Sequence, residues 1–364
     1  GGGRAPATTL MVEDGAVLGD KWLVRPDSDV TPRLVEAGYD VAELVGARMV
    51  RYHRGLEPDR PDALTLYVSR VDSWLADVER RGFEPYLTLT YQPDFWSLPP
   101  PGPDEQAFVE RFGAFCGDVA ARYAGRITRF GVWNEPNNRK WGGGLERRPR
   151  LYGVLFSECA TAVRAVDPDA TVAYGEIDAH RADACEYVDR SLTRPTVADA
   201  LAIHTYQWTT PPERPLAGSS PCQGIGRLDD WHAARGDWAS RGMIVTGGGV
   251  PPPLWITEHG YCAAAGECSA RDNANSLDEA TRADYLRRSF AWARLKGVEV
   301  FGQYHLFRQV PGDQLWDSGI VGLPADPALA PTPTPSVQAL RQAVADDSTS
   351  LVSDLDPFPP SLRR

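Results

Sequence analysis

The chain has 364 residues, of which 42% are hydrophobic and 24% are charged, a composition typical of a globular protein with a sizeable core. Its net charge of −11 argues against nucleic acid as a partner, because phosphate backbones are bound by basic surfaces. No apolar run approaches the roughly 18–20 residues that span a bilayer, so the sequence predicts no transmembrane helix. The first residues contain no apolar signal core, and we expect that a secretion signal has been removed or never existed.

Short apolar runs alternate with amphipathic segments along the chain. A weak strand-like run covers residues 8–12, and clearer ones cover residues 47–53, 84–91, 127–133, 170–176, 200–206, 254–258 and 298–306. Strands that alternate with helical segments indicate βα units and a parallel sheet. Eight such units in a chain of this length predict an α/β protein with a (β/α)₈ TIM barrel. The alternative is an open doubly wound sheet, which is disfavoured because no glycine-rich phosphate loop follows the first strand.

Two of the amphipathic segments carry helix boundary signals. Asp104 is a plausible N-cap, and apolar residues then recur at helical spacing from Phe108 to Tyr123. The same spacing recurs over residues 281–296, and Gly297 stands where a glycine that ends a helix is expected. We therefore expect a helix in each segment.

Residues 1–345 are expected to form a single catalytic domain. Within it, residues 209–253 are rich in Pro and Gly and contain one helical piece. In a barrel they would form an enlarged loop after the sixth strand, on the catalytic face. Residues 346–364 are polar and then proline-rich, and we expect them to form a poorly ordered C-terminal tail.

The six cysteines are even in number, which permits three disulfides without requiring them. Cys262 and Cys268 flank a short loop and are the best candidates for a bridge. Cys185 and Cys222 lie in loop-like stretches and can also pair. Cys116 and Cys159 lie on apolar helical stripes, where a bridge and two buried thiols fit equally well. No Cys/His cluster has zinc spacing, so we expect no metal and no cofactor. The cysteine usage favours an exported enzyme, with a cytoplasmic one as the alternative.

Two of the strand-like runs lead into glutamates that can carry catalytic chemistry. One ends in Asn134-Glu135-Pro136, where the proline stops the strand directly after a carboxylate. The other ends at Glu258. In a barrel the C-terminal ends of the strands surround the active site. Two carboxylates at two strand ends are what glycoside hydrolysis needs, because one protonates the leaving oxygen and the other attacks or activates water.

The sequences around these two glutamates resemble those of the clan A glycoside hydrolases, a barrel clan that includes cellulases, mannanases and β-xylosidases. The matching runs on the fourth and seventh strands are Trp133-Asn134-Glu135-Pro136 and Ile256-Thr257-Glu258. The resemblance implies that Glu135 is the acid/base, that Glu258 is the nucleophile and that anomeric configuration is retained. It also implies that Asn134 hydrogen-bonds the sugar 2-hydroxyl.

Further residues fit the same resemblance. His204 and Tyr206 close the sixth strand on one face, and the resemblance implies a hydrogen bond from Tyr206 to Glu258. Taken alone, His204 is more often a satisfied core histidine. Alternation places Arg51 and His53 on one face of the second strand, and we expect Arg51 to point inward, where its charge would keep Glu258 ionised.

Two strand ends depart from the family pattern. Cellulase-type relatives usually have a histidine after the third strand and a tryptophan at the end of the eighth, whereas this chain has Tyr91-Gln92 and Gln303-Tyr304-His305. Aromatic side chains near strand ends can stack on sugar rings or pack in the core. The two roles are equally expected for Trp96, Trp141 and Tyr304.

The sequence therefore predicts a retaining glycoside hydrolase that cleaves β-linked O-glycosidic bonds of an oligo- or polysaccharide by double displacement. The expected partner is the carbohydrate substrate. The changed eighth-strand end motivates one alternative, a barrel that binds carbohydrate without cleaving it. A second alternative is a transglycosylase that uses the same residues.

Overall fold

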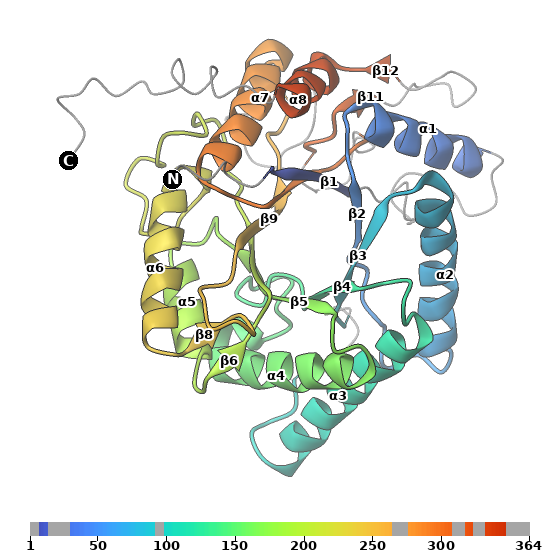
Figure 1. The fold of residues 1–364 in the computed structure, drawn as a ribbon, viewed down its shortest axis with the longest axis vertical. Coiled ribbons are helices and arrows are strands. Elements are labelled where there is room, and N and C mark those ends of the chain that lie inside the picture. The colour runs from blue at the N-terminus through green and yellow to red at the C-terminus, as the bar shows by residue number, and fades with distance from the viewer. Residues whose placement is uncertain are drawn as a thin grey trace.

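The computed structural model of the chain describes residues 7–13, 30–91, 98–263, 276–307, 317–322 and 332–346. Eight parallel strands close into a barrel in the order β1-β10-β9-β7-β5-β4-β3-β2, and their arrangement can be followed in Figure 1. This confirms the predicted (β/α)₈ fold. The barrel strands are β1 (Thr9–Glu13), β2 (Met49–Tyr52), β3 (Glu84–Leu89), β4 (Arg129–Val132), β5 (Thr171–Asp178), β7 (Ala200–His204), β9 (Leu254–His259) and β10 (Val300–Tyr304).

Helices surround the barrel as an outer ring (Figure 1). They are α1 (Val30–Leu44), α2 (Ala63–Arg81), α3 (Pro103–Arg122), α4 (Pro149–Val166), α5 (Ala184–Ser191), α6 (Leu228–Ser240), α7 (Glu279–Leu295) and α8 (Pro335–Ala345). The short elements are the 3₁₀ helices η2 (Leu145–Arg147) and η3 (Ile225–Arg227), and the strands β6 (Thr196–Val197), β8 (Ile244–Val245), β11 (Val321–Gly322) and β12 (Thr332–Pro333).

The helix boundary signals were correct at one of the two predicted sites. Helix α7 is followed by Gly297 at φ +68°, as the C-terminal glycine signal predicts. The predicted N-cap Asp104 is wrong, because Gly102 caps α3 and Pro103 occupies its first turn. Proline lacks the N–H that this position would leave unpaired, and Asp104 in the first turn complements the helix dipole instead.

Alternation along the strands divides the core into two layers. One cluster fills the barrel and draws one or two side chains from most strands, namely Met11, Met49, Tyr86, Ala173, Ala200, Ala202, Trp255 and Val300. The larger cluster lies between the strands and the helices and includes Val50 and Tyr52. The second strand therefore directs Met49 and Arg51 inward and Val50 and Tyr52 outward, as period-2 alternation requires.

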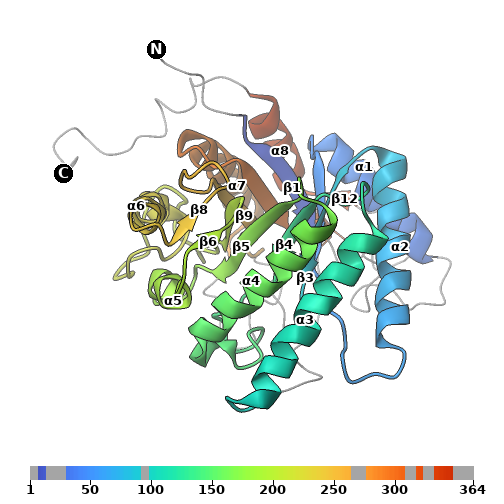
Figure 2. The ribbon, with the colours of Figure 1, turned by 60° about the horizontal axis from the view of Figure 1, so that its bottom comes forward.

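Within the described residues, two disulfides join segments that lie outside the barrel strands. Cys116 on α3 bonds Cys159 on α4, so the bridge rather than the two free thiols is the correct alternative for this pair. These helices run side by side (Figure 2). Cys185 bonds Cys222, a pairing that the sequence allowed. The predicted Cys262–Cys268 pair includes a residue outside the described ranges.

The proline- and glycine-rich segment 209–253 contains regular structure. Residues Leu228–Ser240 form α6, the helix of the sixth unit, and Ile244–Val245 forms β8, which pairs with β6 just ahead of β7. That the residues between position 209 and α6 form an enlarged loop on the catalytic face stays a prediction. Residues 347–364 of the predicted tail lie outside the described residues. None of the described helices is long and apolar enough to cross a membrane.

Candidate active site

Glu135 lies three residues beyond the end of β4, on a strained turn. Trp133 and Glu135 have positive φ angles of 69° and 47°. Residues other than glycine rarely adopt this backbone conformation. The turn is held by a hydrogen bond from the Glu135 backbone N–H to the Glu176 carbonyl at 3.0 Å and by burial of the Trp133 ring. Such backbone strain persists only where the surrounding structure compensates it. The turn directs the Glu135 side chain into the barrel mouth, where the residue is 6% exposed.

Glu258 lies near the end of β9, at a β-bulge. Ile203 on β7 pairs with Ile256, but the next residue, His204, pairs with Glu258, so β9 carries one extra residue between the two pairs. A bulge changes the direction in which the following side chains point. Glu258 accordingly faces the barrel mouth and is 5% exposed.

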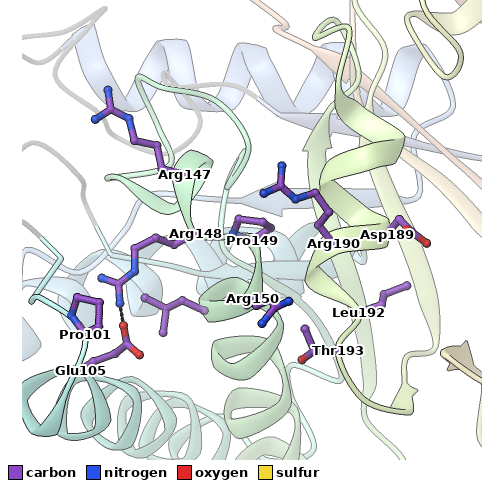
Figure 3. Close-up of a pocket in the computed structure, with 11 residues that line it drawn as sticks. Pro101, Glu105, Arg147, Arg148, Pro149, Arg150, Asp189, Arg190, Leu192 and Thr193 are labelled. Carbon is purple, nitrogen blue, oxygen red and sulfur yellow. Dashed lines mark ion pairs between the residues drawn. The ribbon is translucent and has the colours of Figure 1, made fainter.

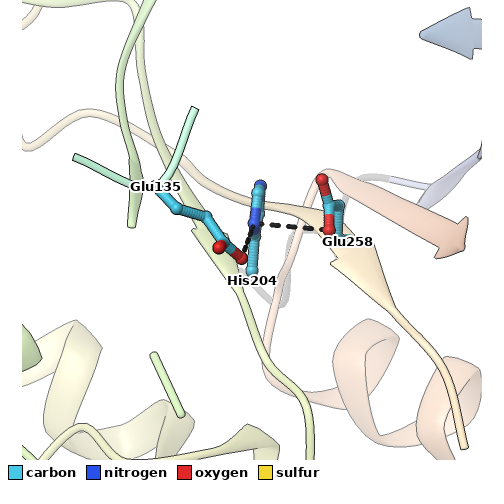
Figure 4. Close-up of side chains that lie close together, drawn as sticks. All are labelled: Glu135, His204 and Glu258. Carbon is cyan, nitrogen blue, oxygen red and sulfur yellow. Dashed lines mark hydrogen bonds and ion pairs between the residues drawn. The ribbon is translucent and has the colours of Figure 1, made fainter. Parts of the chain in front are cut away.

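The His204 ring lies between the two glutamates, which approach it from opposite sides (Figure 4). Its Nδ1 is 2.9 Å from Glu135 Oε1 and 3.4 Å from Glu258 Oε2. One ligand-type atom from each of the three residues lies within 4.8 Å of the other two. The two carboxylates predicted from sequence therefore share one buried imidazole.

Arg51 is fully buried and contacts residues at the ends of both β4 and β9. Its Nη1 is 2.5 Å from Glu258 Oε1, and its Nη2 donates to Asn134 Oδ1 at 2.8 Å. It also forms ion pairs with Glu13 and Glu176. The guanidinium has a fixed planar shape with five donors, so these contacts fix the positions of all four partners.

Tyrosines and a histidine complete the wall around Glu258. The Tyr206 hydroxyl donates to Glu258 Oε2 at 2.6 Å, which is the contact that the resemblance implies. The ring of Tyr304, the last residue of β10, lies 6.0 Å from the Tyr206 ring and 6.5 Å from that of His53. His53 Nδ1 is 2.5 Å from a Glu13 carboxylate oxygen.

Burial and charge shift the ionisation of the central residues. Burial and the nearby Asp178 carboxylate raise the pKa of Glu135 to about 7, and the His204 hydrogen bond offsets part of this rise. Burial alone would lower the pKa of His204, but the carboxylates of Glu258, Glu135 and Glu176 raise it to about 10. Near neutral pH the site therefore holds a partly protonated Glu135 beside a charged imidazolium.

In the described part of the chain, one group of side chains has the spacing of a metal site, namely Glu135, His204 and Glu258. A metal ligand must offer a lone pair, and a protonated imidazole offers none. With the pKa of His204 near 10, its Nδ1 carries a proton at neutral pH. A metal ion bound here would therefore have to displace the proton of His204 Nδ1.

Two other aromatic residues were predicted as possible sugar contacts, namely Trp141 and Trp96. Trp141 is half-buried in the loop after β4, where Lys140 Nζ lies 4.6 Å from its ring centroid and its carbonyl accepts from Trp133. Its ring stacks under the Lys140 ammonium group rather than on a residue of the site. Trp96 lies outside the described residues.

Four polar side chains belong to the site although the sequence did not single them out. Glu13 and Glu176 contact Arg51, and Asn138 donates to both Glu135 Oε2 at 3.1 Å and Asp178 Oδ2 at 2.7 Å. Glu13 and Glu176 end strand-like runs as Glu135 and Glu258 do, so the same signal was available for them. Asn138 and Asp178 carry no comparable signal.

A separate pocket of about 730 Å³ lies around the start of α4, between α3 and α5 (Figure 3). None of its lining residues belongs to a barrel strand or to the predicted site. It gathers four arginines, Arg147, Arg148, Arg150 and Arg190. Glu135 and Glu258 at the barrel mouth do not line this basic pocket.

In overall structure the chain is similar to known glycoside hydrolases. A family 39 glycoside hydrolase from the gut symbiont Bacteroides cellulosilyticus is 16% identical with a TM-score of 0.65, covering 94% of this chain and 64% of that one. A family 1 β-glucosidase from Thermotoga maritima is 12% identical with a TM-score of 0.59, covering 95% and 99%. An endoglucanase from Thermotoga maritima is 16% identical with a TM-score of 0.57, covering 92% and 96%.

These likenesses show a shared fold. The barrel expected from the resemblance to clan A is the barrel that this chain has. The chain spans about 64% of the length of the family 39 enzyme. In sequence, it matches no protein-family model and no curated protein.

Proposed function

We propose that the protein is a retaining glycoside hydrolase that cleaves β-linked O-glycosidic bonds of an oligo- or polysaccharide. One observation carries the proposal: two buried carboxylates at the barrel mouth, Glu135 and Glu258, flank a single imidazole. Retaining enzymes hold their carboxyl groups roughly 5–5.5 Å apart, whereas inverting enzymes leave roughly 6.5–9.5 Å for a water molecule. Oxygens of Glu135 and Glu258 within 4.8 Å of each other support retention.

The reaction proceeds in two displacements. In the first, the Glu135 carboxyl gives its proton to the glycosidic oxygen while Glu258 attacks the anomeric carbon, so the carbon–oxygen bond breaks and a glycosyl ester forms. In the second, the Glu135 carboxylate takes a proton from water, which attacks the same carbon and releases Glu258. Burial supports the first step because it keeps Glu135 protonated up to a pH of about 7.

The contacts of Glu258 suit a nucleophile. Arg51 holds Oε1 and Tyr206 holds Oε2, so the carboxylate is oriented by a donor on each oxygen. We assign Asn134, which Arg51 orients, to the sugar 2-hydroxyl, and Tyr304 to the wall of the sugar site. The two disulfides support an extracellular location for the enzyme.

An activated 2-fluoroglycoside panel tests the proposal, because such compounds trap the glycosyl ester. We expect stoichiometric covalent labelling of Glu258, located by peptide mass spectrometry, and a first product of unchanged anomeric configuration by NMR. Glu258→Ala should turn over no substrate. Glu84→Ala, which changes an exposed glutamate at the opposite end of the barrel, should remain active.

Other outcomes would identify a different function. A product of inverted configuration would remove Glu258 from the role of nucleophile. Saccharide binding without labelling or turnover across the panel would identify a non-catalytic carbohydrate-binding barrel. Labelling with transfer to an added sugar acceptor in place of water would identify a transglycosylase.

A further inference from the structure

Glu176 is a fully buried carboxylate that the two displacements do not use. It lies on β5 at a bulge, where the pairing with β7 shifts between Gly175 and Ile177. Alternation from the inward-facing Ala173 would point Glu176 toward the helices, and the bulge turns it into the barrel instead. A Cβ atom added at Gly131 on β4 would collide with both Glu176 and Tyr86. The glycine therefore leaves room for the Glu176 carboxylate inside the barrel.

The carboxylate of Glu176 has donors on both oxygens. The cations Arg51 and His204 contact one oxygen, with His204 Nε2 at 3.1 Å. The remaining contacts come from Tyr86, Thr88 and Thr257, the last two at 3.2 and 3.4 Å. A buried charge with this many partners is fixed in position, because any movement would leave donors unpaired.

Each of the two cations that touch Glu176 also touches a proposed catalytic carboxylate. Arg51 contacts Glu258, and the opposite nitrogen of the His204 ring contacts Glu135. We propose that Glu176 is a positioning residue: by accepting from Arg51 and His204 on their inner sides, it holds both as charged donors that face the catalytic pair. The inference rests on the proposed function for its catalytic meaning, but the state of the ring can be measured without any substrate.

The charge on the ring matters when Glu135 gives up its proton. Glu135 then becomes a carboxylate in a buried site, and an Nδ1–H that already points at it stabilises the new charge without rearrangement. The groups that face the ring are Glu135 after β4, Glu176 on β5 and Glu258 on β9, with Arg51 and Tyr86 behind Glu176 and Asp178 beside Glu135. The pKa of Glu176 is consistent with these contacts. Burial alone would raise this pKa, but Arg51 and His204 lower it to about 2.

The first test uses the unaltered chain. It contains six histidines, so ¹⁵N-histidine NMR spectra over a range of pH are simple enough to assign by single substitutions. We expect both His204 nitrogens to carry protons from pH 5 to pH 9. His259, whose pKa burial lowers to about 4, provides a neutral reference ring in the same spectra. A neutral His204 ring at pH 7 would overturn the proposal.

The second test compares Glu176→Gln, which keeps the shape and removes the charge, with Glu176→Asp, which keeps the charge. In Glu176→Gln we expect His204 to lose its proton at a lower pH than in the unaltered chain, and kcat/KM to fall about 100-fold, mainly through kcat. Glu176→Asp should keep the ring charged and recover at least about tenfold of that loss. Equal losses in both variants, or an unchanged His204 titration in Glu176→Gln, would assign Glu176 a purely structural role.

The two tests separate this inference from the proposed function. A protein that cleaves no glycoside but shows a permanently charged His204 would contradict the proposed function and leave the positioning contact intact. An active enzyme with a neutral His204 would contradict the positioning role alone. If Glu176→Gln does not fold, the unaltered chain and Glu176→Asp still decide the outcome.

Discussion

Replacing Glu135 with glutamine should stabilise the folded protein while removing its proposed acid. Burial and Asp178 raise the pKa of Glu135 from its ordinary value of 4.5 to about 7. Because the folded state binds this proton more tightly than the unfolded state, the associated stability is fully present below pH 4.5 and is lost as the pH rises through 7. Glutamine has the shape of the protonated acid and no charge to bury.

The two pKa values give the size of the effect. A change from 4.5 to about 7 corresponds to about 3 kcal/mol of unfolding free energy. The variant and the unaltered protein should therefore have similar stability near pH 4, and the variant should be more stable by about 3 kcal/mol at pH 8. Urea unfolding followed by the fluorescence of the eleven tryptophans measures both values.

An exposed glutamate provides the matched control. Glu110 on α3 lies at the surface and accepts a hydrogen bond from Gln106, so Glu110→Gln should change stability by a small amount that is the same at both pH values. If Glu135→Gln also shows no difference between pH 4 and pH 8, the carboxyl of Glu135 is not destabilised by burial. The assignment of Glu135 as a protonated acid near neutral pH would then be wrong.

Three further predictions concern activity and stability. Because Glu135 must be protonated, kcat/KM should fall about tenfold per pH unit above a pH of about 7, and a flat profile to pH 9 would contradict this. Tyr206→Phe removes one donor to Glu258 and should lower kcat about tenfold with KM little changed. Initial rates equal to those of the unaltered enzyme would show that this hydrogen bond does not contribute to catalysis. Joint replacement of Cys116 and Cys159 by alanine should lower the unfolding free energy by about 4 kcal/mol at constant kcat, as chemical denaturation can measure.

Much of this protein could be predicted from its sequence because local patterns carry the information. Apolar runs of strand length that alternate with amphipathic segments are enough to indicate a parallel barrel, since few other arrangements bury eight such units. The strand ends at Glu135 and Glu258 stood out because a carboxylate closes each apolar run. Arg51 could be placed inside the barrel because alternation on β2 is regular.

Residues outside regular alternation could not be placed in this way. Asn138 and Asp178 reach Glu135 from a loop and from a strand end, and their side chains look like ordinary surface polar groups in the sequence. The Cys116–Cys159 bridge was undecided for a similar reason. Whether two cysteines on separate helices meet depends on how α3 packs against α4, which neither helix specifies alone.

The sequence by itself determined the barrel and the positions of the Glu135 and Glu258 carboxylates at strand ends. Only the tertiary structure decided that these carboxylates share one imidazole, because bulges reverse the direction of a side chain. Strict alternation from Trp255 on β9 and from Ala173 on β5 would turn Glu258 and Glu176 toward the helices. One extra residue in each strand, visible only as a shift in pairing with β7, brings both onto His204.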